Sequence, residues 1–247
     1  MSKSLMVAGV VLAGAAGLAA CHPLRQALHL RSDRPMTVAA SLTCPPVQGR
    51  LIRVSTDADG QACAYRGQND DAITLTRLDL NGRSPRDALA GAEGQLRSQM
   101  SSAPVSSEPP GAPTDRDHGD HAKVDLPFVH VDADNDRAHV QVFGVSIDAD
   151  NDNAHVNTNW GSKHAVIKAG PEGAEIRAED IRKGDANLVY ILASDEPGPS
   201  GYRSLGYIAR GPANGPLVVA TFKSKAEHHH DIHNHDLDQL IALNITQ

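Results

Sequence analysis

The 247 residues carry 30 acidic against 23 basic side chains, for a formal net charge of −7, and only 3% of the chain is aromatic. This acidic balance argues against nucleic acid as a partner, because phosphate binding needs a basic face. The scarcity of aromatic residues predicts a core of Val, Ile, Leu and Ala, which favours short strands over a deep ligand cavity.

Residues 1–20 form an apolar leader that is too short for a dependable membrane span and is typical of an export signal. The LAAC tetrad at 18–21 resembles the lipobox of bacterial lipoproteins, in which the signal is cleaved before a lipidated cysteine. The resemblance implies palmitate-type acyl chains on Cys21, and each buried methylene adds about 0.8 kcal/mol to membrane affinity. His22, rather than aspartate, resembles lipoproteins sorted to the periplasmic face of the outer membrane. The alternative is an apolar leader that ends in LAAC by chance.

Cys44 and Cys63 remain as a pair once Cys21 is assigned to lipid. In an oxidising periplasm, two such cysteines that flank a strand predict a disulfide. A loop of this length would add roughly 3 kcal/mol of stability on the chain-entropy account. The alternative is a metal-binding or redox pair, although the spacing is not that of a CxxC motif.

Residues 21–40 have mixed charge and no clear period, so they are interpreted as a tether, and residues 41–100 as a small β+α module. Strands are predicted in this module at 51–56, 61–66 and 72–80. Ser84 before Pro85 is typical of a helix start. The helix would run to about Met100.

Residues 101–120 are rich in proline and have no apolar period, so they are predicted to be a disordered linker between two domains. Residues 121–226 form the predicted second domain, which is nearly all strand and turn. Beyond the repeat described below, strands are predicted at 165–168, 174–177, 187–193, 202–210 and 216–223. The predicted fold is therefore mainly β, as an antiparallel sandwich, a curled sheet or a short solenoid.

An internal repeat opens this second domain. Val131–Val140 reads VDADNDRAHV and Ile147–Val156 reads IDADNDNAHV, sixteen positions later. A short repeat at a fixed offset usually places one supersecondary unit beside its copy, since a single copy cannot bury its own apolar face. An EF-hand calcium loop is excluded, because the required glycine and glutamate are replaced by Arg137 and Phe143 in the first copy. The central aspartates are interpreted as turn formers.

A turn at the centre of each copy would pair Asp132 with His139, and Asp148 with His155, across two hairpins. Two carboxylates and two imidazoles would then share one surface. Such ligands suit zinc, and imidazoles also suit copper or nickel. The alternative is a set of solvated cross-strand pairs.

Residues 227–247 are predicted to be a His-rich tail with a short apolar segment that docks on the domain. Five tail histidines are a second candidate for weak zinc or copper binding: His228, His229, His230, His233 and His235. The alternative is a solvated segment that responds to pH.

No GxSxG, P-loop, HExxH or GxGxxG motif occurs, so the sequence does not indicate an enzyme. The stretch GYRSLGYIARGPANGPLVVATFKSK, with the repeat and the two cysteines, resembles envelope proteins of alphaproteobacteria that have no assigned activity. This resemblance implies an envelope location and transfers no functional residue. We expect a structural or interaction role, with an envelope protein as a candidate partner. The alternatives are a module that buffers or senses zinc or copper and, least favoured, an envelope hydrolase.

Overall fold

The computed structural model describes most of the chain from Pro35 onward. The described residues are 35–100, 121–126, 129–134, 137–142, 145–150, 154–170, 173–182, 184–194, 196–226 and 234–246. The predicted signal peptide with Cys21, the linker at 101–120 and the tail histidines before His235 lie outside these ranges.

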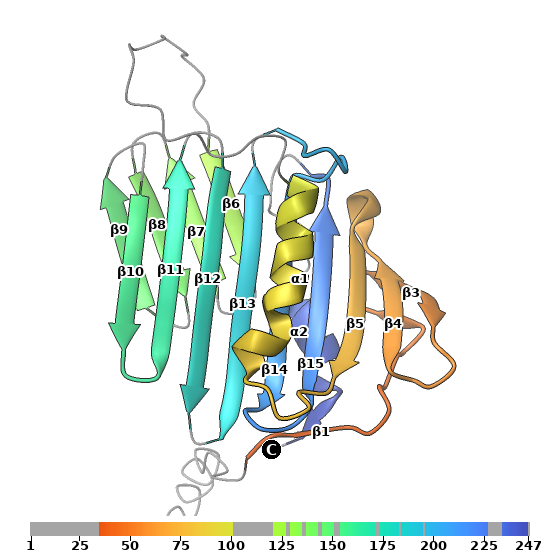
Figure 1. Cartoon of the computed structure of the whole chain (residues 1–247). Helices are drawn as coiled ribbons and strands as arrows, with labels where there is room; N and C mark the ends of the chain where they lie inside the picture. The colour runs from red at the N-terminus through yellow and green to blue at the C-terminus, as the bar shows by residue number, and fades with distance from the viewer. Residues whose placement is uncertain are drawn as a thin grey trace, which may run out of the picture. The chain divides into compact units, whose positions relative to one another are not determined.

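The largest element is an antiparallel sheet of ten strands (Figure 1). In spatial order these are β10 (Ala154–Trp160), β11 (Lys163–Gly170), β12 (Gly173–Arg182), β13 (Asp185–Ser194), β14 (Ser204–Pro212), β15 (Leu217–Ser224), β5 (Ala72–Leu78), β4 (Ala62–Arg66), β3 (Leu51–Thr56) and β2 (Val47–Gln48). The prediction of a mainly β, antiparallel fold is confirmed.

The sheet runs across the predicted domain boundary. Strand β5 pairs with β15 over its whole length, for example Leu75 with Ala220 and Ile73 with Phe222. Residues 41–100 and 121–226 are therefore not two separately folded modules, and this part of the domain prediction is wrong. The physical reason is that a few short strands cannot bury an apolar face alone, whereas pairing with β15 extends one continuous core.

Helix α1 (Pro85–Met100) covers one face of the sheet, and helix α2 (Asn234–Ala242) lies on the other (Figure 1). The α1 face buries Leu80, Leu89, Leu96, Ala186, Leu188, Tyr190, Leu192, Leu205, Tyr207, Ala209, Leu217 and Val219. The α2 face buries a second cluster, which includes Leu51, Tyr65, Leu75, Ile167, Ile176, Ile191, Ile208, Phe222, Leu237, Leu240 and Ile241. Alternation along the strands thus supplies two cores.

Helix α1 starts as the sequence predicts. The Ser84 hydroxyl accepts a hydrogen bond from the Asp87 backbone N–H at 3.2 Å and donates one to the Asp87 carboxylate at 2.7 Å. This bond satisfies one of the backbone donors left free at a helix start. Leu89 and Leu96, seven residues apart, bury the apolar side of the helix.

The C-terminal segment docks beside the first described residues. Strand β1 (Thr37–Val38) pairs with β16 (Ile245–Thr246). The buried Asn244 side chain accepts from the Thr43 backbone N–H at 2.6 Å and donates to the Thr43 and Leu240 carbonyls. A short 3₁₀ turn, η2 (Gln68–Asp70), joins β4 to β5. None of the helices in the described ranges is both long and apolar enough to cross a bilayer.

The repeat forms most of a separate four-stranded antiparallel sheet. Its order is β6 (His121–Leu126), β7 (Val129–Asp134), β8 (Arg137–Val142) and β9 (Val145–Asp150). The first copy supplies β7 and β8. The second supplies β9, at the edge of this sheet, and β10, which is the edge strand of the ten-stranded sheet.

Candidate functional site

The best-defined polar feature of the described structure joins α1 to the sheet. It consists of six charged side chains, here called the charge ladder: Arg86, Glu93 and Arg97 on α1, and Glu175, Arg177 and Glu179 on β12. Every second residue of a strand lies on one face, and helix residues four and seven apart lie on one side. The two rows therefore face one another with alternating and opposite charge.

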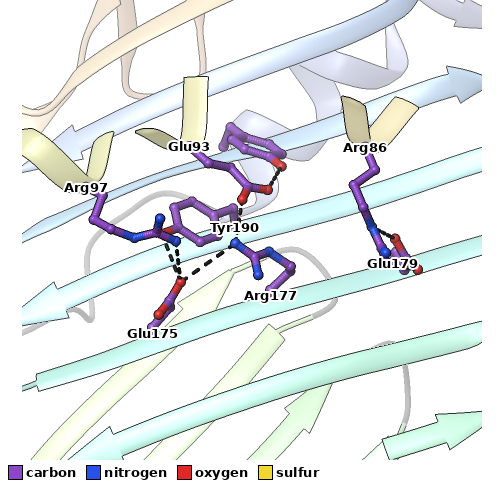
Figure 2. Close-up of polar contacts among 8 residues, drawn as sticks. Arg86, Glu93, Arg97, Glu175, Arg177, Glu179 and Tyr190 are labelled. Atoms are coloured by element: carbon purple, nitrogen blue, oxygen red, sulfur yellow. Dashed lines mark hydrogen bonds and ion pairs between the residues drawn. The ribbon is translucent and has the colours of Figure 1, made fainter. Parts of the chain in front are cut away.

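Each member of the ladder meets an opposite charge (Figure 2). Arg97 Nη2 lies 2.9 Å from Glu175 Oε1, and Arg177 Nη2 lies 2.5 Å from Glu93 Oε2. The third ion pair joins Arg86 to Glu179. The order of charges along the helix thus matches the order along the strand, which fixes both the direction and the register of α1.

Two buried tyrosines complete the ladder. Tyr190 Oη donates to Glu175 Oε1 at 3.1 Å and accepts from Arg97 at 3.0 Å. Tyr207 Oη donates to Glu93 Oε1 at 2.8 Å. The guanidinium groups of Arg97 and Arg177 lie over the Tyr190 ring, 5.8 and 5.3 Å from its centroid, at cation–π distance.

The surroundings shift the pKa values of these groups. Burial, with the nearby Glu175 carboxylate, raises the pKa of Tyr190 to about 12, and burial beside Glu93 raises the pKa of Tyr207 further. For Glu175, burial alone would raise the pKa, but hydrogen bonds from Arg97 and Tyr190 outweigh it and the net pKa is lowered. At neutral pH both tyrosines are therefore uncharged hydrogen-bond donors.

The charge ladder can hold α1 in place on the sheet. Glu175 and Glu93 each accept hydrogen bonds from an arginine and a tyrosine, and Glu179 accepts from Arg86. Sequence analysis missed it. The signal was present as the alternating charges of EIRAE at 175–179 and the matching charges of α1. Neither row identifies its partner without knowledge that α1 lies over β13 and β14, with its charged side chains reaching β12.

The predicted metal residues of the first repeat copy occupy the expected positions. Asp132 is the register partner of His139 in the β7–β8 hairpin. On its other side, His139 is the partner of Asp148 in the β8–β9 pair. The three residues therefore form one row across three strands.

The predicted pairing of Asp148 with His155 is wrong. His155 lies in β10, where its register partner is Lys168 of β11. Strands β9 and β10 carry the same motif as β7 and β8 but belong to different sheets. Local sequence allows either arrangement, and the pairing of β10 with β11 decides it.

His139 is half-buried. Among the side chains that the structure describes, no group of three or more His, Cys, Asp or Glu residues is placed to hold a metal ion. Of the tail histidines, His235 is described. It is exposed on α2, and its Nε2 lies 2.6 Å from Gln239 Nε2. His228, His229, His230 and His233 lie outside the described residues.

Cys44 and Cys63 lie at disulfide distance, as predicted. Their Cα atoms are 6.3 Å apart, within the range of natural disulfides. Cys63 is buried in β4, and Cys44 packs against the same core from the segment before β2. The pair therefore ties the first described residues to the sheet.

No protein-family model matches the chain, and neither a curated protein nor a solved structure is similar to it.

Proposed function

We propose that the protein is a lipid-anchored protein on the periplasmic face of the outer membrane, with a non-enzymatic structural or interaction role. The LAAC tetrad that ends at Cys21 supports the anchor, because it resembles the cleavage and lipidation signal of bacterial lipoproteins. The tether between the lipid and the first described residue is then residues 22–34, shorter than the predicted 21–40 because Thr37 and Val38 pair with β16. An envelope protein is the proposed partner.

The observation that carries the proposal is the Cys44–Cys63 pair, at a Cα separation of 6.3 Å. Disulfides form and persist in oxidising compartments such as the periplasm and are rare in the cytosol. The pair therefore supports the same compartment as the leader does, from an independent part of the chain.

The polar groups of the described interior support a structural role. The charged side chains of the ladder form ion pairs that dock α1, and the buried Asn244 is hydrogen-bonded to backbone groups.

The test is fractionation of cells that express the full chain or its Cys21→Ala variant. Wild type is expected in the outer-membrane fraction, and the variant is expected outside it. Crosslinking of intact cells should join the wild-type protein to an envelope protein. Equal membrane association of wild type and variant would contradict the anchor.

A second candidate function is the binding of zinc or copper, favoured by one observation. The register places Asp132, His139 and Asp148 in a single row across β7, β8 and β9. Imidazole and carboxylate are ligands that zinc accepts, and imidazole also suits copper. The tail histidines would be a separate and weaker site.

Titration calorimetry with zinc and with copper tests this second candidate. His139→Ala should abolish binding at the row, whereas His155→Ala should leave it unchanged because β10 belongs to the other sheet. Gln141→Ala, two residues along β8, is the matched control. Binding that His139→Ala does not weaken would exclude the row as the site.

A further inference from the structure

The edge of the large sheet formed by β2 and β3 exposes large apolar side chains. Val47, Ile52 and Val54 are 58%, 61% and 60% exposed, the three highest values among the exposed large hydrophobic residues of the described chain. Val47 and Ile52 are register partners, so they lie side by side. Apolar side chains gathered at one edge, unlike single exposed ones, mark an interaction surface.

Arginines lie beside these apolar side chains. Arg66 is the register partner of Ile52 and Arg50 is two residues before it, so both share the face of Ile52, whereas Arg53 is the register partner of Tyr65 on the other face. All three arginines are exposed. The Arg50 side chain donates to Gln68 Oε1 at 3.3 Å, while its backbone N–H donates to Asp236 Oδ2 at 2.9 Å. Arg53 donates to the Cys44 carbonyl, so the two guanidinium groups make these side-chain contacts with uncharged acceptors.

The charge of this region is opposite to that of the rest of the protein. Residues 22–56 contain five arginines and one aspartate, whereas the whole chain has a net charge of −7. From Pro35 to Thr56 no acidic residue occurs, and the first carboxylates, Asp57 and Asp59, come at the turn after β3. The positive part of the chain is therefore the part that follows Cys21.

The edge is poorly suited to pairing with another strand. Strand β2 already covers Leu51 and Ile52, and the register between β3 and β4 shifts between Arg53 and Ser55. Short edge strands and bulges are features that blunt an edge against strand addition. A partner would therefore bind the side chains of this edge rather than its backbone, and these side chains combine apolar surface with positive charge.

Exposed apolar side chains beside arginines suit binding to an anionic phospholipid bilayer. The apolar groups enter the boundary between headgroups and acyl chains, and the guanidinium groups contact phosphate. The tether sets the distance. Thirteen residues, 22–34, lie between Cys21 and Pro35, and an extended chain over that span reaches at most roughly 50 Å. We propose that Val47, Ile52 and Val54, with Arg50 and Arg66, dock on the anionic bilayer that holds the lipid. This inference rests on the proposed anchor at Cys21.

The experiment uses the full lipidated chain, reconstituted in phosphatidylethanolamine and phosphatidylglycerol vesicles with bromine-labelled acyl chains. Trp160 is the single tryptophan, so a Trp160→Phe background reports on an introduced probe alone. Val54→Trp places the probe at the proposed surface. Asn157→Trp is the matched control, because Asn157 is exposed in β10, the edge strand at the opposite end of the same sheet.

Bromine should quench the Val54→Trp probe about twofold or more relative to the Asn157→Trp probe, because bilayer-buried apolar side chains contact acyl chains. High salt or an added Arg66→Glu substitution should reduce this difference, since the attraction to anionic lipid is screened by salt. Ile52→Trp repeats the measurement if Val54→Trp fails to fold.

Vesicle flotation separates the possible failures. Protein that floats with the vesicles while both probes stay equally unquenched overturns the docking and leaves the anchor. A Val54→Trp probe that is shielded from aqueous quencher but not reached by bromine indicates a second copy or another protein on this edge, and also overturns the proposal. Protein that does not float overturns the anchor and the docking together.

Discussion

The two helices cover opposite faces of one sheet by different means. Helix α1 lies over β13 and β14 through two leucines, a charge ladder and two tyrosine hydroxyls. Helix α2 buries Leu237, Leu240 and Ile241 completely and is fixed at its end by Asn244. Apolar burial is non-directional, whereas matched ion pairs specify one register. The α1 face therefore gains its specificity from polar contacts, and the α2 face gains stability from burial.

The largest expected effect comes from the α2 face. Leu240→Ala removes a fully buried side chain from the core that α2 shares with β3 to β5 and β11 to β15. The free energy of unfolding should fall by about 2–5 kcal/mol, as for other large-to-small core changes. Urea denaturation measures it. The control is Leu243→Ala, because Leu243 is 48% exposed; equal losses in the two variants would contradict the packing of α2.

The Cys44–Cys63 pair belongs to the core on the α2 face of the sheet. Reduction should lower the free energy of unfolding by roughly 3 kcal/mol, because the bond closes a loop between residues that are 19 apart in sequence. Denaturation with and without reductant measures the loss, and a Cys44→Ala/Cys63→Ala variant should be insensitive to reductant. A wild-type protein whose stability does not change on reduction would show that the bond is absent.

The charge ladder tests the α1 face. Glu93→Gln removes the charge that Arg177 and Tyr207 share; Tyr207 is buried and the Arg177 side chain is 34% exposed. A loss of about 1–3 kcal/mol is expected, since a buried donor loses a charged acceptor. Arg86→Gln breaks the ion pair with Glu179, in which Arg86 is 55% exposed. This change should lower the free energy of unfolding by at most about 1 kcal/mol. A larger loss for Arg86→Gln than for Glu93→Gln would contradict the account that the Arg177–Glu93 pair holds α1 more strongly than the Arg86–Glu179 pair.

The smallest effects concern pH and are confined to the α1 face. The folded pKa of Glu175 is lowered from 4.5, so its stabilising contribution is present above that value and is lost as pH falls through the folded pKa. The folded pKa of Tyr190 is raised from 10.0 to about 12, so its contribution is present below pH 10 and is lost between about 10 and 12.

The absorbance of tyrosinate, measured against pH, tests the predicted ionisation of Tyr190 above pH 10. The wild-type tyrosine titration should include a late fraction that ionises well above pH 10, and Tyr190→Phe should reduce that fraction. The free energy of unfolding of Glu175→Gln, measured against pH, tests the acidic range. It should depend less on pH below 4.5 than that of the wild type. A tyrosine titration in which Tyr190→Phe removes no late fraction would contradict the burial of Tyr190.

Much of the local structure could be predicted from sequence. Strands β3, β4, β5 and β11 to β15 lie where apolar and β-branched runs between turn residues place them, because those signals are local. The Ser84 cap, the register of Asp132 with His139 and the Cys44–Cys63 distance follow from equally short-range patterns.

Long-range choices could not be predicted. The motifs around β9 and β10 nearly repeat those around β7 and β8, yet the second copy is divided between two sheets. Identical local preferences cannot distinguish these outcomes, so tertiary packing decides between them. The pairing of β5 with β15 and the rungs of the charge ladder likewise join residues that are far apart in sequence, and each half is an ordinary strand or helix alone.

The central claim is the lipid anchor, and mass spectrometry of the N-terminal peptide from membrane-extracted protein tests it most directly. The account predicts that the chain begins at Cys21, that residues 1–20 are absent, and that Cys21 carries acyl chains. A chain that retains its leader, or that begins elsewhere with an unmodified Cys21, would contradict the anchor.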